Sequence, residues 1–419
     1  MQALLLTSCF VAALLVSLAL KFWLASRQMR HVAAHRGAVP AAFAAIIPLA
    51  AHQKAADYTL AKGRFGLLST GFGAAVLIAW TLLGGLDALN AVVRDALQPR
   101  LGNMGYQLAL AAAFALIAGL LDAPFEIWST FRIEQRFGFN RMTWKLYLAD
   151  AAKGALVGAL IGLPIAALIL WIMGATGALW WLWAWAAWMG FNLLILVLYP
   201  TVIAPLFNTF EPLADESLKS RVQALMARCG FTARGLFVMD GSRRSAHANA
   251  YFTGFGAAKR VVFFDTLLAK LTPTEVEAVL AHELGHYHHH HIWKRLAVIG
   301  AGSLAFFALL GHLAGQAWFF EGLGMQASGT APTLVLFALV LPVFTFPLTP
   351  LMSRWSRKHE FEADAYAASH APAAELVSAL VKLYRDNAST LTPDPVYSSV
   401  YDSHPPAAIR IARLQELTR

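Results

Sequence analysis

Long apolar runs alternate with polar segments along the 419 residues of this chain. Seven runs are long enough for an α-helix to cross a lipid bilayer, which takes about 20 residues. An eighth apolar run, 37–51, is short and is interrupted by Pro40 and Pro48, so we expect it to lie at the interface or to pack against the protein. We predict membrane spans at 4–24, 65–86, 104–121, 154–173, 179–198, 296–320 and 332–352.

This pattern predicts a mainly α-helical, polytopic membrane protein with a small β element, including a strand at 260–265. Two polar segments, 199–295 and 353–419, are long enough to form a lobe outside the membrane. Although two spans separate them in sequence, they can pack together into one domain. The expected organisation is therefore 1–198 with five spans and their loops, 199–295, then 296–352 with spans six and seven, and 353–419.

The composition supports a membrane protein. Hydrophobic residues make up 58% of the chain and charged residues only 14%, whereas soluble domains carry about 25% charged residues. The two cysteines, Cys9 and Cys229, suggest neither a disulfide framework nor a cysteine metal site.

The basic residues predict how the spans are oriented. Of 33 Lys and Arg residues, 30 fall in the odd-numbered loops and the C-terminal tail, two fall in the even-numbered loops, and Lys21 lies in the first span. By the positive-inside rule, the N-terminus is outside, and the odd loops, both polar segments and the C-terminus are cytoplasmic. The net charge of +9 then reflects topology and attraction to anionic membrane lipid, and we expect no nucleic-acid partner.

A helix is predicted over 272–295. Thr272 is a good N-cap, Pro273 suits the first helical position, and Glu275 completes a capping box. The histidine run 286–291 is expected to continue this helix, with most of its side chains in solvent or at the interface.

The same helix carries the pattern H-E-x-x-H. His282 and His286 are four residues apart and project from one helix face, where they can bind one metal ion. Glu283 lies beside them and is placed to accept a proton from a water molecule. The pattern alone also fits an ordinary helix with two surface histidines and a glutamate.

A catalytic zinc ion usually takes three protein ligands. The metzincin pattern requires Gly at 289 and His at 292, but the chain has His289 and Ile292. The third zinc ligand is therefore expected to be a glutamate on a second helix.

The segment 353–366 supplies the best candidate for this glutamate. Glu360 and Asp364 share a helix face, so Glu360 can bind zinc while Asp364 orients one of the histidines. Glu362 points elsewhere and is expected to be solvated. Spacing alone leaves open that Glu360 and Asp364 are surface charges.

The chain resembles the integral-membrane zinc CAAX prenyl proteases, a seven-span gluzincin family that cleaves the C-terminus of prenylated proteins. The resemblance rests on many separate motifs in one order, which together cover nearly the whole chain. They are HQKAADY at 52–58, TFRIE at 130–134, FGFN at 137–140, PLFN at 205–208, SRRSAHANAYF at 242–252, H-E-x-x-H at 282–286, SR at 353–354, EFEAD at 360–364 and HPP at 404–406.

The resemblance implies one Zn²⁺ per chain, held by His282, His286 and Glu360, with Glu283 as general base. It also assigns roles that spacing does not reveal. Asn249 resembles a substrate-contacting asparagine, and His404 matches a histidine that stabilises the oxyanion. Arg410 matches an arginine near the site and is expected, with Asn249, to bind substrate. Without this resemblance, we would expect His404 to be a solvated residue before a Pro-Pro turn and Asn249 to be a turn residue.

The family further implies tilted helices around a wide chamber, with the zinc site at its cytoplasmic end, and hydrolysis of a peptide or protein substrate, prenylated or not. The alanine-rich composition favours a bacterial homologue in the inner membrane.

The sequence leaves three alternative functions open. A heat-shock-type membrane quality-control metalloprotease shares the zinc motif but has fewer spans. An intramembrane-cleaving protease would bury the motif in an apolar span, whereas here Glu275, Glu277, Lys294 and Arg295 flank it. A polytopic metal transporter would place polar ligands at the membrane midplane, where these spans offer little besides His312.

Overall fold

The computed structural model describes residues 1–233, 235–253, 260–326 and 329–417. In this part of the chain, seven helical segments are long and apolar enough to cross a membrane, which confirms the predicted number of spans. They are built on α1 (Gln2–Ala34), α2 (Leu49–Trp80), α3 (Gly85–Trp128), α4 (Trp144–Ala175), α5 (Trp180–Leu198), α10 (His291–Leu313) and α12 (Thr330–Thr345).

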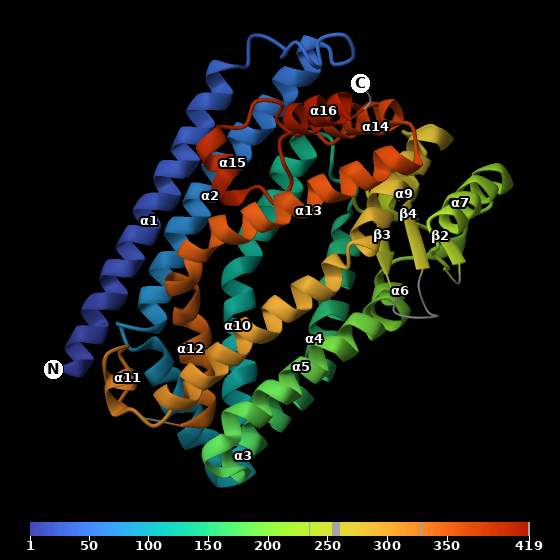
Figure 1. The fold of residues 1–419 in the computed structure, drawn as a ribbon. Helices are drawn as coiled ribbons and strands as arrows, with labels where there is room; N and C mark the ends of the chain where they lie inside the picture. Colours follow the sequence, from blue (N-terminus) through green and yellow to red (C-terminus); the bar gives the residue numbers. More distant parts are fainter. Residues whose placement is uncertain (234, 254–259, 327–328, 418–419) are drawn as a thin grey trace.

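Shorter helices connect and extend these spans (Figure 1). The α-helices are α6 (Ala204–Phe207), α7 (Glu216–Arg228), α8 (Asp265–Leu268), α9 (Pro273–His288), α11 (Ala317–Glu321), α13 (Thr349–His370), α14 (Ala373–Asp386), α15 (Pro395–Tyr401) and α16 (Ala407–Glu416). Two π-helical turns, η1 (Ser129–Glu134) and η3 (Tyr199–Ile203), continue α3 and α5.

Two predicted span boundaries are wrong. The span at 65–86 ends earlier, because α2 stops at Trp80 and α3 starts at Gly85. The span at 296–320 is too long, because α10 stops at Leu313 and the apolar residues that follow form α11. Phe319 and Phe320 of α11 are buried against α1 and α12, so their hydrophobicity serves packing inside the protein.

The short apolar segment 37–51 is packed against the protein. Phe43 and Ile47 are buried and lie in one hydrophobic cluster with Val381 of α14 and Ile411 of α16. This segment therefore ties the first two membrane helices to the C-terminal helices.

Four strands form one small sheet in the order β1-β2-β4-β3. The central pair β2–β4 is parallel, and β1 and β3 each add an antiparallel edge. The strand predicted at 260–265 is confirmed as β4. The strands are β1 (Phe210–Pro212), β2 (Gly235–Met239), β3 (Ala250–Thr253) and β4 (Arg260–Phe264).

One hydrophobic core joins the two polar segments of the sequence. Leu225 of α7, Phe263 of β4 and Leu284 of α9 share this core with Leu376 of α14 and Leu414 of α16. The segments therefore pack together, as expected, and they lie at one end of the long helices, across the top and right of Figure 1.

The helix with the H-E-x-x-H pattern begins as predicted and ends earlier. Thr272 and Glu275 form the expected capping box at the start of α9. The helix does not continue to Arg295, because it ends at His288 and His290 adopts a left-handed conformation with φ 57°. A new helix, α10, starts at His291 and enters the membrane region in a different direction.

Helices α9 and α13 approach each other closely at Gly285. A Cβ atom at this position would lie 2.8 Å from the Cα of Ala363 and 3.1 Å from the Cβ of Tyr366. Only glycine permits this backbone contact, so Gly285, one residue before His286, sets the separation between the two helices.

We predict that Gly285→Ala destabilises the lobe by about 1–3 kcal/mol, the usual cost of overpacking, and weakens metal binding by pushing α13 away from α9. The midpoint of thermal unfolding and the bound metal content test this. Gly302→Ala in α10 is the matched control, because its added Cβ meets no atom within 4 Å. Equal effects of the two substitutions would contradict the prediction.

Candidate metal centre

His282 and His286 extend from the same face of α9 towards α13. His282 is 7% exposed, and His286 is partly exposed. Their rings lie 5.0 Å apart between centroids, nearly perpendicular to each other. The four-residue spacing thus brings both imidazoles to one point on the helix surface.

Glu360 on α13 meets both histidines. Its Oε2 lies 3.4 Å from Nε2 of His282, and its Oε1 lies 3.3 Å from Nε2 of His286. Glu360 is 4% exposed, and among the described residues its Oε2 has no hydrogen-bond partner. A buried carboxylate oxygen without a hydrogen bond is costly unless a cation neutralises it.

These three side chains fit a zinc ion. One ligand atom from each lies within 4.8 Å of the others. Two imidazole nitrogens and one carboxylate oxygen are a donor set of catalytic zinc sites, which leave a fourth position open for water. The unpartnered oxygen of Glu360 also faces this point, so the residues present match the chemistry that the spacing predicts.

Asp364 holds the far side of His282. Its Oδ1 lies 2.9 Å from Nδ1 of His282, as expected for a carboxylate that orients a metal ligand. Burial opposes protonation of His282, but hydrogen bonds to Asp364 and Glu360 outweigh it and raise its pKa to about 9. The surroundings of this ring therefore favour positive charge.

Arg410 of α16 is buried behind Asp364. Its Nε and Nη2 donate to Oδ2 and Oδ1 of Asp364 over 2.9 Å and 2.6 Å, and its Nη1 lies 3.7 Å from Oε2 of Glu360. The side chain is 5% exposed. In this arrangement Arg410 neutralises Asp364, and the contact with substrate that the resemblance implies stays a prediction.

Glu283 and His404 are the two predicted catalytic residues. In the described part of the chain, the half-buried carboxylate of Glu283 makes no hydrogen bond or ion pair. His404 has 63% of its side chain exposed, and its Nε2 lies 3.5 Å from Oε1 of Glu360. Both side chains are thus accessible to a bound molecule.

Sequence reasoning missed a second group of side chains beside the centre. His291 is buried, with Nδ1 2.9 Å from Nδ1 of His286 and Nε2 2.9 Å from Oε2 of Glu362. Glu362 was expected to be solvated, but it is only partly exposed and pairs with His291. Most of the histidine run was expected in solvent or at the interface; His288 and His290 are exposed, and His291 is the buried exception. His359 of α13 stacks on His291 with ring centroids 3.9 Å apart. Only the break in the helix at His290 brings His291 back to His286.

Asn249 lies elsewhere, at the wall of a large cavity. The cavity has a volume of about 1230 Å³ and is bounded by α1, α2, η1, the loop before β3, and α15. Asn249 is exposed and directly precedes β3, and its Oδ1 accepts a hydrogen bond from the amide of Ala250. Of the predicted site residues in the described part of the chain, Asn249 alone lines this cavity.

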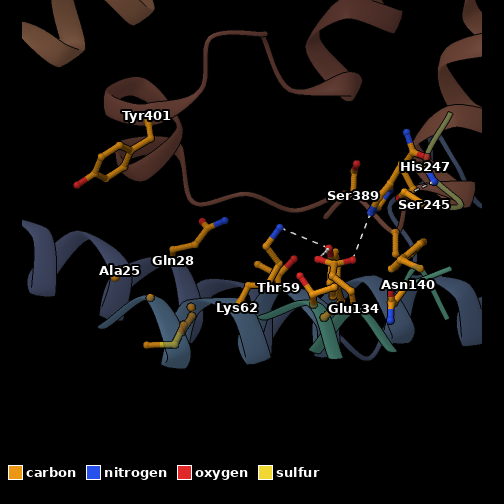
Figure 2. Close-up of a pocket in the computed structure, with 18 of the residues that line it drawn as sticks. Ala25, Gln28, Thr59, Lys62, Glu134, Asn140, Ser245, His247, Ser389 and Tyr401 are labelled. Atoms are coloured by element: carbon orange, nitrogen blue, oxygen red, sulfur yellow. Dashed lines mark hydrogen bonds and ion pairs between the residues drawn. The ribbon is translucent and has the colours of Figure 1, made fainter. Parts of the chain in front are cut away.

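A polar network projects into the same cavity (Figure 2). Tyr58 donates to Oε1 of Glu134 over 2.5 Å, and Lys62 lies 3.4 Å from the Tyr58 hydroxyl. Nε2 of His247 lies 3.5 Å from the other oxygen of Glu134. Glu134 and His247 belong to sequence motifs quoted above, but nothing in their spacing indicates that they meet.

Family models match almost the whole chain. One, described as the CAAX prenyl protease N-terminal segment with five membrane helices, matches residues 28–209. The other, described as peptidase family M48, matches residues 212–418. The boundary between them falls at β1.

Individual relatives agree with these models. The chain is 36% identical to a CAAX prenyl protease 1 homolog of Oryza sativa subsp. japonica, over 74% of this chain and 73% of the relative. It is 33% identical to the homolog of Arabidopsis thaliana, over 89% of both chains. The crystal structure of S. mikatae Ste24p has the same fold, with a TM-score of 0.90, 29% identity, and 98% of both chains covered.

We predict that Arg410→Gln destabilises the protein by about 3–5 kcal/mol, because it leaves the buried Asp364 carboxylate without its cation. The midpoint of thermal unfolding measures the loss. Arg413→Gln, on the exposed side of the same helix, is the control and should change the midpoint little. A similar small change for both variants would contradict the prediction.

Proposed function

The chain belongs to peptidase family M48 and to its CAAX prenyl proteases, and on that premise we propose that His282, His286 and Glu360 hold its catalytic zinc ion. It is a multi-pass membrane metallopeptidase that acts on peptide or protein substrates. One observation carries the proposal: two imidazoles from α9 meet the buried carboxylate of Glu360 from α13, whose Oε2 has no hydrogen-bond partner among the described residues. The family membership decides against the metal transporter.

Zinc, when bound, supplies Lewis-acid chemistry, which lowers the pKa of a water molecule to about 7 and polarises the scissile carbonyl. Glu283 is the general base in this proposal. Its carboxylate, which makes no hydrogen bond or ion pair within the described residues, accepts a proton from the attacking water and then delivers it to the leaving amine. The neighbouring ligand His282 fixes where this transfer takes place.

His404 stabilises the oxyanion that forms on the carbonyl oxygen. The hydroxyl of Ser403 lies 3.0 Å from Nδ1 of His404. When this hydroxyl donates, the neutral imidazole carries its proton on Nε2, the nitrogen that lies 3.5 Å from Glu360. An N–H at that position can donate to developing negative charge.

We place the substrate backbone along β3. This strand is an edge of the sheet, so its free side can accept an extended peptide by strand addition. Asn249 precedes β3 and lines the cavity, where its amide can pair with the substrate main chain. A peptide on this path runs between the cavity and the metal centre, and Arg410 supports the centre from behind.

The relatives are called CAAX prenyl proteases, and we propose a substrate of that kind, a peptide with its cleavable bond near the C-terminus. The proposal covers substrates with or without a prenyl group, and we expect membrane lipid to surround the protein. The heat-shock-type quality-control protease is less favoured, because the N-terminal family model spans five membrane helices.

The bias of Lys and Arg supports a cytoplasmic catalytic lobe and C-terminus, with the N-terminus outside. We retain four functional segments: 1–198 and 296–352 in the membrane, and 199–295 and 353–419 for catalysis. The alanine-rich composition supports a bacterial inner membrane as the location.

Glu283→Ala should abolish peptide cleavage while zinc remains bound, because Glu283 transfers the proton but is not a ligand. Peptidase activity on a fluorogenic peptide and zinc content of the purified protein test both parts. Glu277→Ala, a carboxylate on another part of α9 that pairs with Arg221 and Arg228, should keep most of the activity. Full cleavage by the Glu283 variant would refute the assignment.

Asn249→Ala should lower kcat/KM by about 10-fold, the effect of one lost hydrogen bond to the substrate. Zinc content should stay at the wild-type level, because Asn249 contacts none of the proposed ligands. Asn103→Ala, an exposed asparagine on α3, is the matched control and should leave kcat/KM unchanged. Wild-type kinetics for both variants would remove Asn249 from the substrate site.

A further inference from the structure

His291 connects the proposed zinc ligand His286 to a carboxylate on the other catalytic helix. The side chain of His291 is 3% exposed, and both of its ring nitrogens are engaged. Nδ1 faces Nδ1 of His286 at 2.9 Å, and Nε2 faces Oε2 of Glu362 at 2.9 Å. Glu362, His291 and His286 therefore form a continuous hydrogen-bonded chain.

The carboxylate end of this hydrogen-bonded series, Glu362, fixes which atoms donate and which accept. The carboxylate of Glu362 can only accept, so the proton of a neutral His291 lies on Nε2. Nδ1 of His291 is then an acceptor, and the donor opposite it is Nδ1–H of His286. Nε2 of His286 is consequently left with a free lone pair, and this nitrogen is the one that faces Glu360 at 3.3 Å.

Asp364 does the same for His282 through one bond. It accepts from Nδ1–H of His282, which leaves Nε2 of His282 with its lone pair towards Glu360. The two histidines thus reach the same tautomer by different routes, one through a carboxylate and one through a second histidine. A metal ligand usually has such a partner on its other ring nitrogen.

We propose that Glu362 and His291 are positioning residues that fix the tautomer and the ring orientation of His286 for zinc. This inference rests on the proposed zinc centre and assigns a role to Glu362 and to one member of the histidine run. Helix α13 then supplies a carboxylate for each histidine ligand of α9: Asp364 orients His282 directly, and Glu362 orients His286 through His291.

The break between α9 and α10 makes this contact possible. On a continuous helix, a residue five positions after His286 would be rotated by about 140° and would point away from it. The left-handed conformation of His290 turns the chain so that His291 lies over His286. The ring of His359, stacked on His291 with an interplanar angle of 11°, holds the turned imidazole in place.

His291, His359 and Glu362 lie close enough to suggest a second metal site. The geometry favours the hydrogen-bonded chain instead. Both nitrogens of His291 are already within 2.9 Å of His286 and Glu362. The rings of His291 and His359 are nearly parallel, so their lone pairs run side by side and do not converge on one ion.

The test is the rate at which zinc leaves the purified full-length protein for an excess of chelator. His291→Phe keeps the ring stacked on His359 and removes both hydrogen bonds. We expect zinc to leave this variant about 10–100-fold faster, the usual effect of losing such a partner. Glu362→Gln keeps a side chain of the same size but no longer fixes the proton order, and zinc should leave it at an intermediate rate.

Three control variants separate the possible explanations. Lys358→Met removes the other partner of Glu362, 3.8 Å away, and His288→Ala removes an exposed histidine of the same run. Both should release zinc at the wild-type rate. Glu360→Gln removes a proposed ligand and should leave no stoichiometric zinc.

The outcomes are distinguishable. Wild-type zinc content in Glu360→Gln would overturn the zinc centre itself. Loss of zinc from Glu360→Gln together with wild-type rates in His291→Phe and Glu362→Gln would overturn only the positioning role. Two zinc ions per chain, falling to one in His291→Phe, would establish the second metal site in its place.

Thermal unfolding of the metal-free proteins shows whether His291→Phe folds as the wild type does. If His291→Phe does not fold like the wild type, the zinc release rate of Glu362→Gln tests the positioning role instead, because this substitution alters no ring packing. Zinc release from Glu362→Gln at the rate of Lys358→Met would then overturn the positioning role.

Discussion

The close contact between α9 and α13 is the constraint on which the metal centre depends. At Gly285 the two backbones approach to a distance that no side chain on α9 would allow. One residue further along α9, His286 reaches Glu360, and one turn earlier His282 does the same. Because the three donor atoms must meet within a few ångströms, the separation of the helices decides whether a zinc site exists at all.

Both catalytic helices lead directly into the membrane. Helix α9 is followed by α10 after the turn at His290, and α13 follows α12 after one short 3₁₀ turn at Phe346–Leu348. The centre is therefore anchored by two membrane helices, and its height relative to the bilayer is set by them.

Charge at the centre is balanced by pairing across the helices. Asp364 is neutralised by Arg410, while Glu360 receives only longer contacts from three histidines and Arg410. Glu360 is thus the buried carboxylate that lacks a short hydrogen bond on Oε2. Buried carboxylates persist when they are paired or coordinate a metal, and this difference distinguishes the proposed ligand from the residue that supports it.

The sequence by itself determined the seven membrane helices, the capped start of α9, and the four-residue spacing of His282 and His286, because these depend on local hydrophobicity and helical periodicity. Only the tertiary structure decided which carboxylate does what on α13. Glu360, Glu362 and Asp364 follow one another at intervals of two residues, but they have different partners. Glu360 meets His282 and His286, Asp364 meets the other nitrogen of His282, and Glu362 meets His291. The position of His291 was also undetermined, since the sequence predicts one continuous helix through the histidine run. The break at His290 is stabilised by contacts of His291 with His359 and Glu362, which lie on a distant segment. Local patterns report which face a residue occupies, whereas partners from other helices are fixed only when the helices pack.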